Sequence, residues 1–182
     1  MRIRPLLAGV TLLIVGGCAD DGAIVEPTSR SDAAEGRSSE RAASGAQRIA
    51  VWGTFAANVD FSTLTLTPRG RNCLLEVDGA LVFSGTIEGT ATGRTAALVF
   101  APCDDVATTA PGTYRDVFRS ELMFEGEVDG QPASANVLYM GGVQPGGTID
   151  GRLVFSNGLA GRLDADAVVA VGGDYEGSLV MR

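Results

Sequence analysis

Apolar and polar side chains alternate along the chain from residue 73 onward, and this alternation constrains the fold more than any other feature. In CLLEVDGALVFSGTIEG (residues 73–89), every odd position is apolar or glycine, whereas the even positions include Glu76, Asp78, Ser84 and Glu88. Successive side chains of a β-strand point to opposite faces. The stretch therefore predicts a strand that lines an apolar core on one face.

The same alternation recurs in four later segments. In TYRDVFRSELMFEGEVDG (residues 113–130), the positions of the apolar face are even: Tyr114, Phe118, Leu122, Phe124, Gly126 and Val128. The segments TIDGRLVF, GLAGRLDADAVVAV and DYEGSLVM continue the pattern, and no segment shows the sustained apolar stripe of a helix. We expect about eight antiparallel strands, joined in sequence by short turns.

Eight sequential strands favour a closed barrel over an open sheet. An open sheet leaves two edge strands whose backbone groups can pair with other chains, and closure removes both edges. The strand count and the cost of open edges are compatible with an all-β fold made of a single eight-stranded antiparallel up-and-down barrel, which is the fold that the family resemblance given below implies. The interior of such a barrel is either filled by side chains or holds one small ligand, and the sequence is compatible with both.

A short motif of polar, apolar, acidic and glycine residues occurs four times, as TIEG (86–89), EVDG (127–130), TIDG (148–151) and DYEG (174–177). Glycine after an acid suits a hairpin turn, and glycine within a strand marks a bulge or strong coiling. An alternative makes the acids calcium ligands, although known calcium loops carry their acids in denser alternation.

These motifs, together with the segments FSGTIEGTATG, FEGEVDG and GGDYEGSLV, resemble the bacterial relatives of the allene oxide cyclase barrel. The resemblance covers most of residues 50–181 and implies an eight-stranded antiparallel barrel, the fold of the plant cyclases and dirigent proteins. The bacterial relatives are small secreted or lipid-anchored proteins, mostly of unassigned function. No catalytic residue of the plant enzymes matches a position here, so the resemblance implies a fold and no activity.

The first 17 residues, MRIRPLLAGVTLLIVGG, have the parts of an export signal: Arg2 and Arg4, an apolar run, and small residues before the cleavage point. The apolar run is too short to span a bilayer permanently. VGGC (residues 15–18) resembles the lipobox of bacterial lipoproteins, which implies that Cys18 carries a diacylglycerol after the signal is removed. The alternatives are ordinary secretion with a thiol at Cys18 and an uncleaved start.

This interpretation divides the chain into a lipoprotein signal peptide (1–17), a lipidated cysteine with a disordered tether (18–47) and a barrel domain (48–182). The tether is small, polar and charged, a composition that buries too little apolar surface to offset the entropy of ordering. We expect export, with the lipid anchoring the protein to the extracytoplasmic face of a membrane. In some lipoproteins an aspartate directly after the lipidated cysteine retains the protein at the inner membrane. Here that position is Ala19, which favours transport to the outer membrane if the host has one.

Cys73 and Cys103 are the other two cysteines, and an oxidising compartment favours a disulfide between them. A hairpin that turns at residue 88, midway between them, would place the two side chains opposite each other. If the first strand instead continues through Thr92, the two residues lie apart and only a curled loop could join them. A disulfide that closes a loop of about 30 residues contributes about 3–4 kcal/mol to stability. The bond would anchor the start of the longest predicted loop, residues 101–114; the alternative is two free thiols.

The composition excludes several classes of chemistry. All 14 basic residues are arginine, histidine is absent, and the formal net charge is −8. Without histidine the chain lacks Ser-His-Asp and Cys-His arrangements and the commonest metal ligand; without lysine it lacks Schiff-base chemistry and a phosphate-loop lysine. The acidic balance argues against nucleic acid, because phosphate contacts dominate that affinity. We therefore name no catalytic residue, cofactor or metal site and favour a protein that is not an enzyme.

Three side chains are the candidates for contact with a ligand. Trp52, the only tryptophan, either caps a ligand cavity or packs in the core or at the rim. Arg115 and Arg119 lie on one face of a predicted strand. They either form a patch for an anionic ligand or pair with acids across strands, as the nearby Glu121 favours.

The sequence leads to two main hypotheses for function. The first is a membrane-tethered extracytoplasmic lipoprotein that serves as a non-enzymatic binding or interaction module of the cell envelope, with an envelope protein as partner. The second is a binder of a hydrophobic small molecule, or a cyclase-like enzyme, that works inside the barrel. A third is an inhibitor or assembly factor that acts through the loop 101–114.

Overall fold

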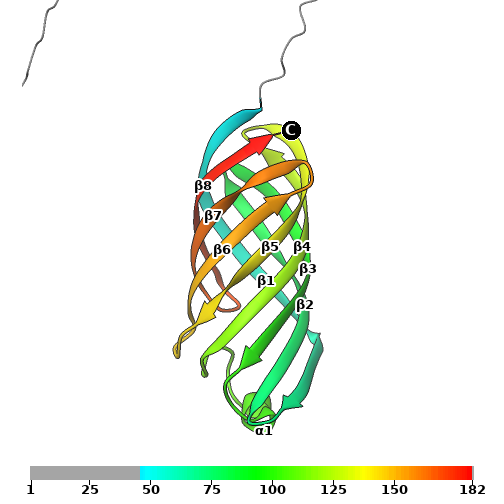
Figure 1. Cartoon of the computed structure of the whole chain (residues 1–182), viewed down its shortest axis with the longest axis vertical. Coiled ribbons are helices and arrows are strands. Elements are labelled where there is room, and N and C mark those ends of the chain that lie inside the picture. Colours follow the sequence, from blue (N-terminus) through cyan, green and yellow to red (C-terminus); the bar gives the residue numbers. More distant parts are fainter. Residues whose placement is uncertain (1–45, 182) are drawn as a thin grey trace, which may run out of the picture. The chain divides into compact units, whose positions relative to one another are not determined.

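The computed structural model describes residues 46–181, so the predicted signal peptide, Cys18 and nearly all of the predicted tether lie outside the described range. Eight strands and one helix, α1 (Cys103–Thr108), follow one another along this range (Figure 1). The strands are β1 (Gln47–Arg69), β2 (Asn72–Gly85), β3 (Ile87–Val99), β4 (Asp116–Val128), β5 (Gln131–Val143), β6 (Thr148–Ser156), β7 (Leu159–Val168) and β8 (Gly172–Met181). Within residues 46–181, no helix has the length and apolar character that crossing a bilayer requires.

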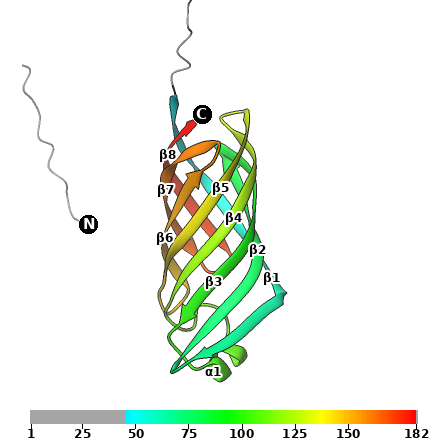
Figure 2. The same cartoon turned by 45° about the vertical axis from the view of Figure 1, so that its right-hand side comes forward.

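Each strand pairs antiparallel with the next, and β8 returns to pair with β1, so the sheet closes into a barrel. Figures 1 and 2 show the strands winding obliquely around the barrel axis. The predicted eight-stranded antiparallel up-and-down barrel is confirmed. The first strand begins at Gln47, one residue before the predicted start of the domain.

The alternation of side chains places the apolar face of each strand inside the barrel. In β4, Leu122, Phe124 and Val128 are buried, and the residues between them are exposed. Full burial of a large apolar side chain contributes about 1.5–3 kcal/mol. Because the side-chain period of a strand is two, these apolar positions also determine which way every other residue of β4 points.

Aromatic rings fill the interior at one end of the barrel. The ring of Phe83 lies 5.6–6.5 Å, between centroids, from those of Phe55, Phe124, Phe155 and Tyr175. The Tyr175 hydroxyl accepts a hydrogen bond from the backbone amide of Ile87 at 3.0 Å. We call this the packed end; it holds the start of β1 and the end of β8, at the top of Figure 1.

The sequence left two roles open for the glycines of the repeated motif, a turn or a position within a strand, and the structure contains both. Gly130 lies in the turn between β4 and β5 with φ at 71°. The other three lie within β3, β6 and β8: Gly89, Gly151 and Gly177.

The hairpin of β2 and β3 turns at Thr86, two residues before the predicted position, because Gly85 takes the positive φ (115°) that a sharp turn needs. In the resulting register Val99, not Cys103, lies opposite Cys73. The predicted register is therefore wrong. The structure nevertheless joins Cys73 to Cys103, with the two Cα atoms 4.8 Å apart, because the chain curls after β3 into α1, which begins at Cys103.

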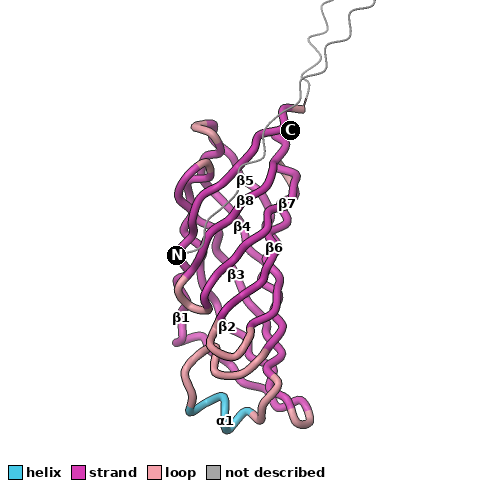
Figure 3. Tube along the Cα trace, turned by 90° about the vertical axis from the view of Figure 1, so that its left-hand side faces the viewer, coloured by secondary structure: helices cyan, strands magenta, loops and turns pink. Residues whose placement is uncertain are grey.

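The segment between β3 and β4, which the sequence predicted as a loop, contains α1 and lies at the end of the barrel opposite the packed end (Figure 3). The Gly112 carbonyl of this segment accepts a hydrogen bond from the Gly146 amide at 3.0 Å, and the Gly147 carbonyl accepts one from the Val169 amide at 2.9 Å. A third bond joins the turn between β7 and β8 to the amide of Ala57. The connections at this end thus form a linked rim.

Candidate ligand-binding cavity

The barrel wall is incomplete at the end that holds α1. β1 pairs with β8 only as far as Ala56, and β2 is the only strand that pairs with its remaining residues, 57–69. The register between β1 and β2 shifts between Asp60 and Thr65. One side of the interior at this end is therefore bounded by the free edge of β1, which continues past β8 with β2 beside it (bottom of Figure 1).

A cavity of about 170 Å³ lies inside the barrel at this end. Most of its wall is apolar and includes Phe55, Val77, Leu81, Ala97, Phe118 and Leu122. An apolar protein cavity of about 150 Å³ holds a benzene molecule, so the space suits a ligand built around one ring. The interior is thus packed at one end and hollow at the other.

Two polar side chains of β4 face this cavity. Asp116 and Ser120 lie an even number of residues before Leu122 on β4, so their side chains point to the same, inner face of the sheet. Asp116 is 8% exposed and Ser120 is 4% exposed. The Ser120 hydroxyl lies 2.7 Å from the hydroxyl of Thr95 on β3 and shares a hydrogen bond with it. Both hydroxyl groups therefore have a hydrogen-bond partner within the protein.

The Asp116 carboxylate is one of two polar groups of the cavity that have an unpaired atom. Its Oδ1 atom has no hydrogen-bond partner within residues 46–181, and no arginine belongs to the lining. Burial disfavours the charged form of a carboxyl group and raises the pKa of Asp116 to about 6. The group is therefore mostly ionised at pH 7, with its charge in apolar surroundings.

Tyr139 of β5 brings a second unpaired polar atom to the same cavity. Its ring meets Phe118 and Phe55 edge to face, with centroids 4.9 and 5.8 Å apart, and its hydroxyl has no hydrogen-bond partner in the described part of the chain. Burial, and to a lesser extent the charge of Asp166, raises the pKa of Tyr139, so the hydroxyl stays protonated. Gly151 makes room for the ring, because a Cβ there would lie 2.7 Å from it.

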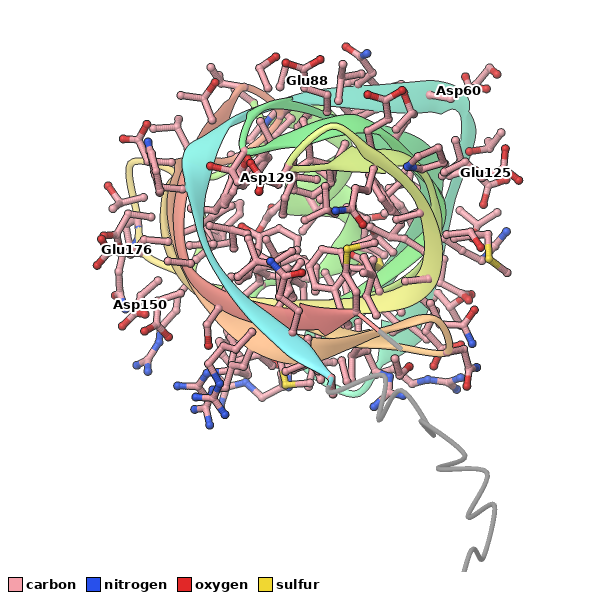
Figure 4. The ribbon with its side chains drawn as sticks, turned by 90° about the horizontal axis from the view of Figure 1, so that it is seen from above. Asp60, Glu88, Glu125, Asp129, Asp150 and Glu176 are labelled. Carbon is pink, nitrogen blue, oxygen red and sulfur yellow. A yellow bond between two sulfur atoms is a disulfide. The ribbon has the colours of Figure 1, made fainter. Side chains whose placement is uncertain are left out.

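Trp52 lies at the packed end, away from the cavity. Its side chain is 65% exposed and borders a surface pocket together with Glu88 and Asp129, two acids that Figure 4 shows at this rim. Of the two interpretations of Trp52, the structure places it at the rim.

Arg115 and Arg119 are exposed and do not line the cavity. The Nη2 atom of Arg119 lies 2.9 Å from Oε1 of Glu121, two residues along the same strand. Arg115 forms no ion pair within residues 46–181. Arg119 thus pairs with an acid of its own strand and not, as expected, across strands. An exposed pair of this kind contributes about 0–1 kcal/mol.

Several other carboxylates of the barrel lie on its outer surface. Figure 4 shows Asp60, Glu125, Asp150 and Glu176 outside the ribbon. In the described part of the chain, no three histidine, cysteine or carboxylate side chains gather closely enough to hold a metal ion. Asp116 is the one buried carboxylate of residues 46–181.

Asp116 and Ser120 are not among the predicted site residues, although the sequence carries a signal for both. The predicted inner face of this strand consists of even positions from Tyr114 to Val128, and both polar residues occupy even positions. A polar residue in an apolar register is worth notice because buried polar groups normally need a partner. The pattern of the other strands could not show that a cavity lies beside them.

Comparison with known proteins bears on the fold alone. No family model and no curated protein matches the sequence. Among solved structures, the chain is similar to a protein of unknown function from the DUF3224 family of Shewanella oneidensis MR-1. The two are 17% identical, with a TM-score of 0.50, and the match covers 75% of this chain and 98% of the other. The similarity shows a shared fold.

Proposed function

We propose that this protein is a binding protein that holds one small, largely apolar molecule in the cavity at the α1 end of the barrel. The observation that carries the proposal is the cavity of about 170 Å³, with its apolar wall and two unpaired polar atoms on Asp116 and Tyr139. Apolar pockets with a few convergent polar groups are the usual form of small-molecule sites.

The size of the cavity limits both the ligand and its affinity. A single ring of six carbons fills much of a space of this order, and burying six such groups contributes about 5 kcal/mol at about 0.8 kcal/mol each. The loss of translational and rotational freedom on binding offsets part of this gain. We therefore expect dissociation constants between about 1 and 10 mM for simple ring compounds.

Filling the cavity tests this proposal. Ala97 lies in the cavity wall on β3, and Ala97→Phe would occupy the space that the ligand needs. Thr92→Phe places the same side chain on the exposed face of the same strand and serves as the matched control. Fluorine NMR titration with fluorobenzene should show saturable binding to the wild type and to Thr92→Phe, and none to Ala97→Phe.

Two outcomes would contradict the proposal. One is the absence of saturable binding to the wild type. The other is undiminished binding to Ala97→Phe, provided that circular dichroism shows this variant to be folded. Because the cavity lies inside the barrel, the difference between the two phenylalanine variants separates interior binding from adhesion to the outer surface.

We also propose that the protein acts outside the cytoplasm, tethered by a lipid on Cys18, and that it is related to the bacterial relatives of the allene oxide cyclase barrel. The VGGC segment after an export-type leader supports the tether. The disulfide between Cys73 and Cys103 supports export, because oxidising compartments favour such bonds. Cys18 itself lies outside the described residues.

Metabolic labelling tests the tether. In a bacterial host, labelled palmitate should enter the wild-type protein and should not enter Cys18→Ala, whereas Cys103→Ser should be labelled like the wild type. Labelling of Cys18→Ala, or recovery of the unlabelled wild type from the cytosol, would refute the anchor.

A further inference from the structure

We propose that the cavity selects small ring compounds that carry one amine, and that it binds them as ammonium ions against Asp116. This inference rests on the proposed function, and it names the chemical class of the ligand. It follows from the charge of the cavity wall, from its aromatic side chains and from the groups that surround the carboxylate.

Asp116 gives the cavity a negative charge that nothing in its lining balances. The side chain is 8% exposed, its Oδ1 has no hydrogen-bond partner within residues 46–181, and the lining contains no arginine. Asp78, the other acid of the lining, is half-buried and pairs with Arg94 at 3.3 Å. A buried carboxylate is costly without a counter-ion, and an ammonium group supplies both the charge and strong hydrogen bonds.

The aromatic wall beside Asp116 suits the remainder of such a molecule. Phe118 lies two residues after Asp116 on the inner face of β4 and meets Tyr139 at a centroid separation of 4.9 Å. Phe55 completes this group of rings on the cavity wall. Aromatic rings pack against the apolar body of a ligand, and their faces also attract cations. Carboxylate and rings together thus match an amine attached to a ring.

The elements packed against Asp116 contribute little competing charge. β3 and β5, the strands that pair with β4, place Val99 and Val143 opposite it. Besides Asp116, the cavity lining holds two titratable groups, Asp78 and Tyr139. Arg94 pairs with Asp78, Asp166 acts on Tyr139, and Asp104, Asp105 and Arg115 lie on α1 and beside the start of β4, all outside the lining. Asp104, Asp105 and Arg115 are exposed to solvent, and Tyr139 remains neutral because burial raises its pKa.

The amine should therefore bind in a defined range of pH. Burial raises the pKa of Asp116 to about 6, so the carboxylate carries its charge above this pH, and the ligand carries its own below the pKa of the amine. Protonation of Asp116 removes the ion pair. Lowering the pH from 7.5 to 5 should weaken amine binding by about tenfold, the ratio of the ionised fractions.

The experiment compares three ligands of one shape on the purified full-length protein: benzylamine, benzyl alcohol and toluene. At pH 7.5, NMR titration should show benzylamine binding at least about tenfold more tightly than either neutral compound. Asp116→Asn should reduce benzylamine affinity to that of benzyl alcohol and change toluene affinity less than about twofold. Asp150→Asn, which alters an exposed carboxylate of β6, should leave both the benzylamine affinity and the toluene affinity unchanged.

The outcomes separate this inference from the proposed function. Toluene binding as tight as benzylamine binding would overturn the amine preference and leave the apolar site intact. Benzyl alcohol binding as tight as benzylamine binding would overturn the ion pair in favour of a neutral hydrogen bond. Failure of all three to bind would overturn both proposals. If Asp116→Asn does not fold, the wild-type ligand ratios and their pH dependence still decide between these results.

Discussion

Asp116 lies at the start of β4, where the inward register of the strand brings a carboxyl group into an apolar cavity. Burial raises its pKa from the ordinary value of 3.8 to about 6. Between these two pH values the folded protein binds a proton that the unfolded chain has released. Stability therefore falls as the pH rises through this window, and the loss is complete above pH 6.

Asp116→Asn should remove this dependence on pH. A pKa shift of about two units corresponds to about 2–3 kcal/mol, so the free energy of unfolding of the variant, relative to the wild type, should rise by this amount between pH 4 and pH 7. Urea unfolding of both proteins at four pH values measures the difference. If the difference in free energy of unfolding between the two proteins stays constant with pH, the pKa of Asp116 is not raised by folding.

At the scale of the secondary-structure elements, glycine pairs allow aromatic rings to lie directly against neighbouring strands. Gly141 of β5 lies opposite Gly151 of β6. A Cβ at Gly141 would lie 2.5 Å from the Asp150 carbonyl oxygen and 3.2 Å from the Phe118 ring. The adjacent Gly142 has room for a Cβ, since the nearest atom would be 3.7 Å away.

Two substitutions in β5 test this difference. Gly141→Ala should lower the free energy of unfolding by about 1–3 kcal/mol, because backbone atoms that cannot move independently occupy the space. Gly142→Ala should change it by less than about 1 kcal/mol, since alanine also restricts the unfolded chain. Thermal and urea unfolding measure both variants. Equal losses would mean that the close approach of the strands is not what requires glycine.

At the scale of the whole barrel, the packed end and the cavity end differ in how the wall is built. Residues 53–56 of β1 pair with strands on both sides, whereas residues 65–69 pair with β2 alone. The same strand therefore passes from a closed sheet into an extension with one free edge. Backbone hydrogen bonds with few buried neighbours open most readily.

Hydrogen exchange should reveal this gradient along β1. Amides of residues 65–69 should exchange at least about tenfold faster than those of residues 53–56. Addition of the ring ligand should slow exchange around the cavity and leave the packed end unchanged. Uniform exchange along β1 would show that the barrel opens only as a unit.

Much of the barrel could be predicted from the sequence, but only part of the cavity. The inward positions of Leu122 and Phe124 follow from alternation along one strand, and so does the inward position of Asp116 once the register is known. Tyr139 and Phe55 belong to other strands, and their meeting with Phe118 depends on how the sheet closes. No local pattern contains that information.

The sequence by itself determined that most of the domain forms β-strands and which face turns inward in the segments that alternate, because alternation is a local property. Closure into a barrel was expected from the family resemblance and from the cost of exposed edges. Tertiary structure alone decided that one end is hollow, that a carboxylate lies there without a partner, and that Cys103 reaches Cys73 from a helix. These features depend on side chains from distant parts of the chain meeting in space, and on the course of a loop that the rest of the barrel positions.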